Sequence, residues 1–196
     1  MGKPTETRRA EIIESALAVA AEVGIKHVTT QAIANRVGIA QSTIFRHFKS
    51  RDEIFSVAIS RIGSNLLQVL EPCFSGEGAA DQRLRELIRC QLEYVSRNRG
   101  LPRILFSDRL HLESPQLKHN VRRVMHNYTT RVSRLLREGV ESGCFDSALD
   151  TDLRARQLAM LIQGLLMRWS VFDFEFDLES ESEPLWELFS RAILSR

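Results

Sequence analysis

One short segment near the N-terminus, residues 29–51, constrains the fold of this chain more than any other part of its sequence. Ile33 and Val37 lie one helical turn apart, and Gly38 follows where a left-handed residue ends a helix without a steric penalty from Cβ. A second short helix is predicted over residues 41–47. The pattern therefore predicts two short helices joined by a tight turn, the arrangement that places one helix in the major groove of DNA.

The second of these helices carries polar side chains opposite its apolar positions, Ile44 and Phe48. Polar side chains on an outward helix face are the groups that contact base edges and phosphates. We expect Gln41, Ser42 and Arg46 to reach base edges, whereas Thr30, His47 and Lys49 hold phosphates. The predicted DNA-binding residues are Thr30, Gln31, Gln41, Ser42, Thr43, Phe45, Arg46, His47 and Lys49.

The charge of the N-terminal segment supports this interpretation. Residues 1–51 contain eight Lys or Arg against four Asp or Glu, whereas the whole chain has a net charge of only +2. A basic head on a mildly acidic body is the electrostatic signature of a DNA-binding domain joined to a second function.

The segment resembles the N-terminal DNA-binding domain of the TetR family of bacterial transcriptional regulators, over residues 8 to about 60. The residues that carry the match are Thr30, Ile33, Ala34, Gly38, Ile39, Thr43, His47, Phe48 and Lys49. Two positions depart from the family pattern. Ala40 stands where the family usually has a Ser or Thr that caps the recognition helix, and Phe45 replaces a Tyr whose hydroxyl binds a phosphate.

Helical periodicity continues along the chain and predicts an all-α fold of about nine helices. We expect a helix-turn-helix DNA-binding domain over residues 1–52 and a helical regulatory and dimerisation domain over residues 53–196. Ser50 and Glu53 form a capping-box pattern, and Ser114 precedes a proline at a predicted helix start. The further helices are expected over about 5–23, 51–70, 81–98, 101–112, 115–142, 151–172 and 183–195.

Two stretches break the helical pattern. Pro72 and residues 75–78 are predicted to end one helix and form a linker. Residues 172–178 alternate apolar and acidic side chains with period two, which predicts an extended, half-buried connector anchored by its phenylalanines.

The last two long helices are the predicted dimer interface. The resemblance implies a four-helix bundle between two subunits, and the apolar stripes here are large for the ends of such a small body. The same stripes would also complete the core of a monomer. The predicted interface residues are Leu158, Leu161, Ile162, Leu165, Trp169, Leu185, Leu188, Phe189 and Ala192.

The resemblance also implies a small-molecule effector bound among the middle helices. Methionines and aromatic residues suit an adaptable apolar cavity with a few polar anchors, although they are also ordinary core residues. The candidate pocket residues are Phe74, Tyr94, Phe106, His111, Met125, Tyr128, Met160, Gln163 and Met167.

Other function classes find little support in the sequence. His119 and His126 lie seven residues apart on one predicted helix, too far to hold one ion unaided, so neither a metal nor a cofactor is expected. No nucleophile elbow, phosphate loop or dinucleotide turn indicates an enzyme. Cys73, Cys90 and Cys144 are expected to act as small apolar residues.

The N-terminus has no apolar stretch of signal-peptide length, and a cytoplasmic protein is expected.

The sequence therefore predicts a homodimeric transcriptional regulator, most simply a repressor that a small ligand releases from a palindromic operator on double-stranded DNA. The alternative is a DNA-bound interaction protein, such as a chromosome-organising or cell-division factor, whose body docks a protein partner.

Overall fold

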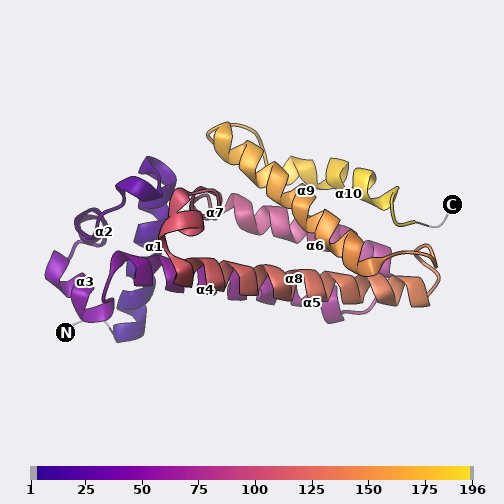
Figure 1. Ribbon diagram of the computed structural model, residues 1–196, viewed down its shortest axis with the longest axis horizontal. Helices are drawn as coiled ribbons and strands as arrows, with labels where there is room; N and C mark the ends of the chain where they lie inside the picture. Colours follow the sequence, from indigo (N-terminus) through magenta and orange to yellow (C-terminus); the bar gives the residue numbers. More distant parts are fainter. Residues whose placement is uncertain (1–3, 195–196) are drawn as a thin grey trace. The chain divides into compact units, whose positions relative to one another are not determined.

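The computed structural model describes residues 4–194, apart from the side chain of Arg109, and within them it contains ten α-helices and no strand (Figure 1). This confirms the predicted all-α class. Three short helical turns, at Ile25–His27, Arg109–Glu113 and Glu179–Glu181, connect the longer elements. The helices are α1 (Thr5–Val23), α2 (Thr30–Val37), α3 (Gln41–His47), α4 (Arg51–Val69), α5 (Glu71–Ser75), α6 (Ala80–Ser96), α7 (Gly100–Leu105), α8 (Pro115–Glu141), α9 (Thr151–Val171) and α10 (Ser182–Ser190).

The chain forms two compact units. Unit 1 comprises the residues up to 63 together with residues 98–122, and unit 2 comprises residues 64–97 and those from 123 onward. Unit 1 extends beyond residue 52 because α7 packs on α1. The functional boundary at residue 52 stays a prediction.

The core of unit 1 is assembled from the apolar faces of its helices. Ile12 and Ala16 of α1, Ile33 of α2 and Ile44 of α3 are all fully buried. Asn120 of α8 donates from Nδ2 to Ser56 Oγ of α4 at 2.7 Å. These contacts hold α2 and α3 on a rigid support.

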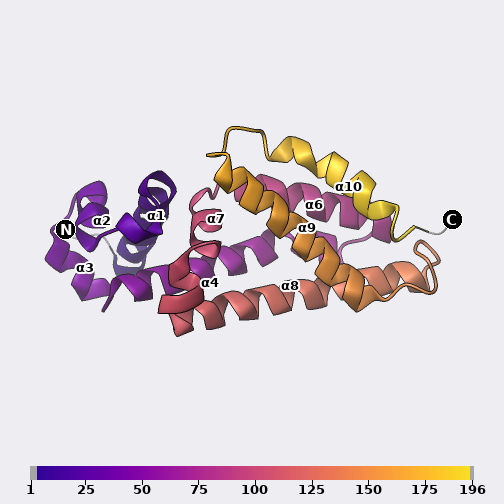
Figure 2. The same ribbon diagram turned by 45° about the horizontal axis from the view of Figure 1, so that its top comes forward.

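The core of unit 2 is built from α6, α8, α9 and α10, which the two ribbon views show running alongside one another (Figure 2). Its fully buried side chains include Leu84 and Leu87 of α6, Leu136 of α8 and Leu158 of α9. Burying an aliphatic side chain of this size contributes about 1.5–3 kcal/mol. Apolar burial is therefore the main source of stability in this unit.

Several predicted helix boundaries are confirmed by their caps. Thr29 Oγ1 accepts from Ala32 N at 3.0 Å at the start of α2. Ser50 Oγ accepts from Glu53 N at 3.1 Å at the start of α4. Ser114 Oγ accepts from Leu117 N at 3.3 Å at the start of α8.

Three expectations about the chain path were wrong. Pro72 does not start a linker, because a proline in the first turn of a helix loses no hydrogen bond, and it lies inside the short helix α5. The helix expected over 101–112 ends at Leu105 and gives way to a separate turn. The stretch after α9 is a turn rather than an extended segment, with φ of 48° at Asp173 and 64° at Phe174.

The anchoring role predicted for the phenylalanines after α9 is correct in part. Phe174 packs edge-on against Trp169 with ring centroids 4.6 Å apart, and Leu178 is buried. Phe172, by contrast, is 48% exposed beneath the guanidinium of Arg168.

Candidate nucleic-acid interface and regulatory surfaces

The turn between α2 and α3 has the geometry that the sequence predicts. Gly38 adopts φ 74° and ψ 40°, and Ile39 N donates to Ala34 O at 3.0 Å, which closes the end of α2. Ala40 precedes α3 without a side-chain cap, as its lack of a hydroxyl requires. The two helices are thus joined by a tight turn that fixes their mutual orientation.

The exposed face of α3 carries Ser42, Phe45 and Arg46, and exposed Lys49 follows the helix. Phe45 is 53% exposed although it is aromatic, so its ring is available to an external apolar group such as a thymine methyl. Arg46 has no hydrogen-bond or ion-pair partner in the part of the chain that the structure describes. Ser42, Phe45 and Arg46 follow helical spacing on α3, and together with Lys49 just beyond the helix they form what we call the reading face.

Other predicted DNA-binding side chains are held within the protein. Gln41 Nε2 donates to Thr30 Oγ1 at 2.7 Å, so these two residues satisfy each other in the free protein. Gln31 Nε2 donates to Asn35 Oδ1 at 2.7 Å along α2. A contact of Gln41 with a base that keeps this bond would use Oε1 or the second N–H of Nε2.

The remaining two predicted residues, Thr43 and His47, are half-buried. The Nδ1 atom of His47 is buried without a hydrogen-bond partner among the described residues. A phosphate contact by His47 would therefore have to use Nε2.

Arg9 of α1 clamps the end of α3, a role that no sequence pattern revealed. Its guanidinium lies 4.1 Å from the centroid of the Phe48 ring and donates to the carbonyl oxygen of His47. Glu53 Oε1 lies 4.0 Å from the same guanidinium, and Glu53 Oε2 accepts from Lys49 N at 2.7 Å. A cation held between an aromatic face and a helix C-terminus fixes the direction in which α3 projects.

Much of the basic charge in this region serves the fold. Arg36 pairs with Glu22 at 2.7 Å, and Arg51 donates to Val28 O at 2.6 Å. The count of basic residues over 1–51 consequently overstates the charge that the region offers to DNA.

The predicted dimer residues divide between the core and the surface of unit 2. Leu158, Ile162, Trp169, Leu185 and Phe189 are at most 8% exposed within the single chain. They are core residues, because the single chain already buries them. Leu161 and Leu165 are half-buried, whereas Leu188 and Ala192 are exposed.

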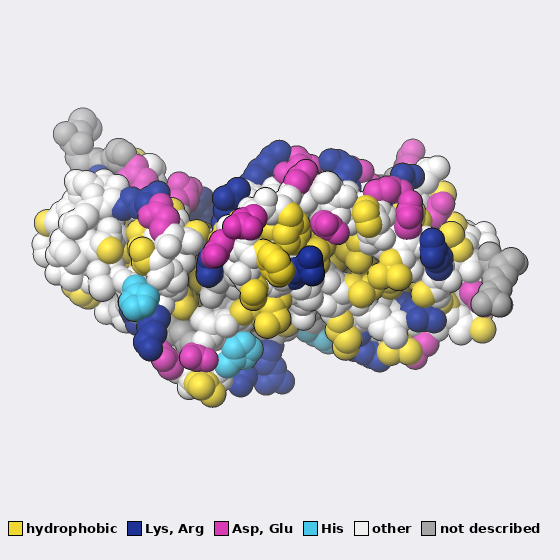
Figure 3. Space-filling model, turned by 90° about the horizontal axis from the view of Figure 1, so that it is seen from above, with side chains coloured by type: hydrophobic (Ala, Val, Ile, Leu, Met, Phe, Trp, Pro, Cys, Tyr) yellow, Lys and Arg dark blue, Asp and Glu magenta, His cyan; other side chains and the backbone are white. Residues whose placement is uncertain are grey.

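A second apolar stripe on α9 faces outward, and the sequence reasoning did not assign it to the interface. Figure 3 looks onto the side of unit 2 that carries α9 and α10, where hydrophobic side chains gather. A groove of about 440 Å³ is lined there by Gln157, Met160, Leu161, Leu188, Phe189 and Ala192. We call the exposed residues Leu153, Met160, Met167, Val171 and Leu188 the apolar face.

The predicted pocket residues do not surround one interior space. Phe74 and Tyr128 are buried, and Tyr128 donates from its hydroxyl to Gln91 Oε1 at 2.7 Å. Burial raises the pKa of the Tyr128 hydroxyl well above its usual range. Met160 and Met167 are 62% and 51% exposed and belong to the apolar face, because the opposite side of α9 faces the core.

The other five pocket candidates differ in burial. Tyr94, Met125 and Gln163 are half-buried in unit 2. Phe106 and His111 belong to unit 1, where both are exposed. The predicted set therefore does not describe one site within either unit.

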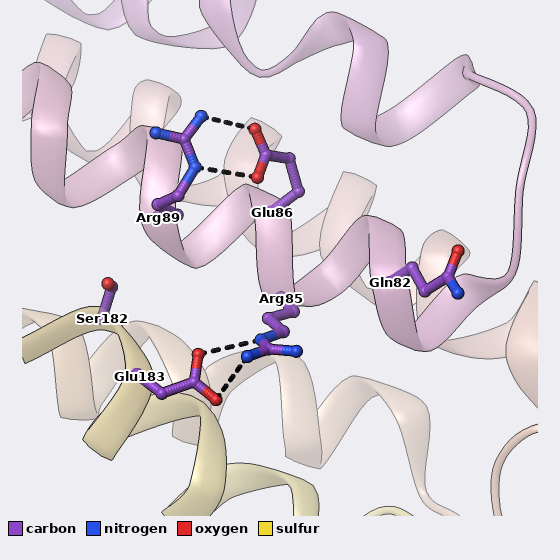
Figure 4. A pocket seen from close by; sticks show the side chains of 6 residues that line it. All are labelled: Gln82, Arg85, Glu86, Arg89, Ser182 and Glu183. Carbon is purple, nitrogen blue, oxygen red and sulfur yellow. Dashed lines mark hydrogen bonds and ion pairs between the residues drawn. The ribbon is translucent and has the colours of Figure 1, made fainter.

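An open cleft of about 480 Å³ lies between α6 and α10 (Figure 4). Its lining includes Gln82, Ser182 and two ion pairs, Arg85 with Glu183 at 2.7 Å and Arg89 with Glu86 at 2.6 Å. Each arginine faces a carboxylate, so the cleft offers no net positive charge to an anionic ligand.

Cys73 and Cys90 lie close together on α5 and α6. Burial raises the pKa of both thiols, and the carboxylate of Glu86, which accepts from Cys90 Sγ at 3.2 Å, helps to raise the pKa of Cys90 to about 12. Burial is also the largest cause that raises the pKa of Cys144. These thiols are therefore protonated near neutral pH, which disfavours thiolate chemistry.

The described residues contain neither a metal-binding cluster nor a membrane-spanning helix. Among them, no three His, Cys, Asp or Glu side chains converge in a way that would hold a metal ion. None of their helices is both long and apolar enough to cross a membrane.

Comparison with known proteins identifies both parts of the chain. The profile of "Bacterial regulatory proteins, tetR family" matches residues 12–58, and that of "Tetracyclin repressor-like, C-terminal domain" matches residues 77–169. Nucleoid occlusion factor SlmA of Vibrio cholerae serotype O1 is 27% identical over 193 residues, which cover 98% of each protein.

Solved structures share the fold at lower identity. The fatty acid degradation regulator FadR from Bacillus halodurans superposes with a TM-score of 0.84 at 21% identity, over 96% of both chains. FadR from Bacillus subtilis, solved with stearoyl-CoA, gives 0.80 at 23% identity and covers 92% of this chain and 96% of its own. With both profiles matched and the helix-turn-helix in place, the chain belongs to the TetR family of DNA-binding bacterial transcriptional regulators.

Proposed function

We propose that the protein is a homodimeric regulator that binds a palindromic operator through the reading face of α3 and represses the adjacent promoter. The observation that carries the proposal is the exposed stripe of Ser42, Phe45, Arg46 and Lys49, held in place by the Arg9 clamp. Unpaired Arg46 suits a bidentate bond to guanine, and Lys49 suits a phosphate.

The apolar face supports dimerisation. Met160 and Leu188 are each more than half exposed, and they flank a groove at the surface of unit 2. Gly164 lies in the same exposed part of α9, and a Cβ built there meets nothing within 4 Å in its own chain. A glycine inside a helix costs about 0.5–1 kcal/mol relative to alanine, which is offset where a second helix approaches closely. The expected occupant is the same face of a second copy, because two-fold dimers join identical patches.

A small-molecule effector is part of the proposal. The buried, hydrogen-bonded pair of Tyr128 and Gln91 is polar, whereas the core of unit 2 around it is apolar. A ligand that enters between the helices could form hydrogen bonds with this pair. FadR from Bacillus subtilis, which shares the fold, was solved with stearoyl-CoA. Release of DNA on addition of long-chain acyl thioesters is therefore the first effector test.

A second candidate function is that of a DNA-bound factor regulated by a protein partner. It is favoured by the similarity to nucleoid occlusion factors, which extends along 98% of both chains. Under this alternative no small ligand dissociates the DNA complex, and sites recovered from the genome are not confined to promoters.

Selection of the purified protein against a randomised duplex pool at physiological salt tests the proposal directly. A palindromic consensus supports it, whereas recovery of no consensus overturns it. Arg46→Ala should weaken the selected site by about 1–3 kcal/mol and relax the preference at one position. Lys49→Ala should weaken all sequences alike and reduce the salt dependence. Equal losses for Arg46→Ala on operator and random DNA would contradict its assigned role.

A further inference from the structure

The long helix α8 presents an exposed face that the operator-binding proposal does not use. Its buried side includes Leu117, Val121, Val132 and Leu136. The helix runs without interruption in both ribbon views (Figures 1 and 2). We call the exposed side of its part in unit 2 the cationic face, which comprises Arg123, His126, Asn127, Thr130, Arg134 and Arg137.

The cationic face belongs to a one-sided run of positive charge. Residues 114–137 contain six Lys or Arg and no Asp or Glu, whereas residues 138–196 contain twelve Asp or Glu against five Lys or Arg. At about 1.5 Å per residue, the exposed cations from 123 to 137 extend over about 21 Å. Such a stripe creates a positive electrostatic potential along the helix. Solubility alone does not require so much charge of one sign in a protein whose net charge is only +2.

Most of these cations are not used by the fold. In the described part of the chain, Arg123, Arg134 and Arg137 have no ion-pair or hydrogen-bond partner. Arg131, on the flank of the helix, pairs with Glu71. The face therefore offers guanidinium groups that are ready to bind an external anion.

The exposed arginines of α6 in the same unit, by contrast, form ion pairs. Arg85 pairs with Glu183 at 2.7 Å and Arg89 with Glu86 at 2.6 Å (Figure 4). Arg97 pairs with Glu93 at 2.6 Å. The lack of carboxylates beside the cationic face is thus a local property and not a general feature of unit 2.

The absence of apolar groups indicates which anion fits. None of the large hydrophobic residues exposed in the described structure lies between residues 114 and 141. Protein interfaces are anchored by buried apolar or aromatic side chains, and this face has none to offer. A polyphosphate backbone needs no such anchor, because its affinity comes from neutralised charge and released counterions. Asn127 and Thr130 supply further hydrogen-bonding groups of the kind that contact phosphate oxygens.

We propose that the cationic face of α8 binds the phosphate backbone of duplex DNA without reading its sequence, in addition to the operator contact made by α3. The protein then has two kinds of DNA surface, one that selects a site and one that holds any duplex. This inference does not depend on the operator or on an effector.

The test measures binding of the full-length protein to a labelled random-sequence duplex between 50 and 200 mM NaCl. The background is Arg46→Ala with Lys49→Ala, which removes the main contacts of the reading face. In that background, Arg123→Gln, Arg134→Gln and Arg137→Gln together should weaken binding about tenfold at low salt. They should also lower the slope of log K against log salt by about 2 to 3, since each lost phosphate contact contributes about 0.9.

The matched control replaces Arg85, Arg89 and Arg97 with Gln in the same background. It removes the same charge from the same unit, but from arginines that already face carboxylates. Binding and slope should change little. An equal loss in both triple variants would overturn the proposal, because net charge and not the α8 face would then explain the effect. Circular dichroism and melting temperature confirm that each variant is folded.

Other polyanions give distinct results. If the α8 variant keeps its DNA affinity but loses binding to vesicles of anionic phospholipid, the face is a membrane-surface site and the proposal is wrong. If instead it loses only salt-sensitive self-association in sedimentation, the partner is the acidic segment 173–187 of a second copy, and the proposal is again wrong. Failure of the random-pool selection with retained α8-dependent binding would reject the operator but not this inference.

Discussion

The exposed sides of α8 and α9 differ in almost every respect, although both helices bury an apolar stripe in the same unit. In that unit, the outer side of α8 carries three cations without a partner among the described residues, Arg123, Arg134 and Arg137, and no large apolar residue. The outer side of α9 carries Leu153, Met160, Met167 and Val171. One surface suits a hydrated polyanion and the other suits a second apolar surface. The contrast teaches that the solvent-facing residues of a helix, and not its core-facing ones, indicate what it binds.

The largest expected effect separates the two stripes of α9. Leu158 is completely buried, so Leu158→Ala should lower the free energy of unfolding by about 2–5 kcal/mol through lost burial and a cavity. Met160→Ala, two residues away and 62% exposed, should cost the isolated chain very little. Urea unfolding at a concentration low enough to favour monomers measures both. If both variants lose a similar amount of unfolding free energy, the two stripes of α9 are not a core stripe and a surface stripe.

The next effect concerns assembly. Met160→Asp with Leu188→Asp places charges on the apolar face and should convert a dimer into monomers in sedimentation velocity. Operator affinity should then fall about a hundredfold, because two linked half-sites bind far more tightly than one. Asn127→Asp on α8 serves as the control for added charge, and it should leave the dimer intact. If the double variant remains dimeric, the dimer interface lies on another surface of the protein.

A smaller effect is expected on the buried side of α8. Tyr128→Phe removes the hydroxyl that donates to Gln91 Oε1 at 2.7 Å and leaves a buried acceptor unsatisfied. Stability should fall by about 1–3 kcal/mol. The double variant with Gln91→Leu should recover part of this loss, since both polar partners are then absent. Chemical denaturation of the three variants measures the coupling, and additive losses would contradict it.

The smallest effect is expected at Gly164, and it tests whether the apolar face is the dimer interface. Gly164→Ala should stabilise the single chain by up to about 1 kcal/mol, because alanine favours a helix and an added Cβ meets open space. In a dimer with closely packed α9 helices, the same methyl group should weaken association. Thermal unfolding at low and high protein concentration distinguishes the two contributions. If Gly164→Ala stabilises the protein at both concentrations, no partner helix packs against this glycine.

Local features of the fold were predictable from the sequence because they depend on neighbours three or four residues apart. The cap at Thr29, the left-handed Gly38 and the capping box of Ser50 and Glu53 are of this kind. The class of the protein followed from the same signals, since the helix-turn-helix is a local motif. These features required no knowledge of how distant segments meet.

The arrangement of the candidate site was only partly predictable. Ser42, Arg46 and Lys49 are exposed as expected, but the bond between Gln41 and Thr30 joins residues eleven apart on different helices. Arg9 reaches the end of α3 across 38 residues of sequence. No periodicity records such contacts, because they arise from packing.

What the sequence by itself determined is most of the helices, several of their caps and the helix-turn-helix, each encoded in short-range spacing and backbone preference. What tertiary structure alone decided is which apolar stripe of α9 is core and which is surface, and which arginines are paired. Leu158 and Met160 are both apolar and sit on the same helix, so only the packing around α9 distinguishes them. Arg85 and Arg134 are likewise the same residue type, and only Glu183, 98 residues from Arg85 in the sequence, gives Arg85 a partner that Arg134 lacks.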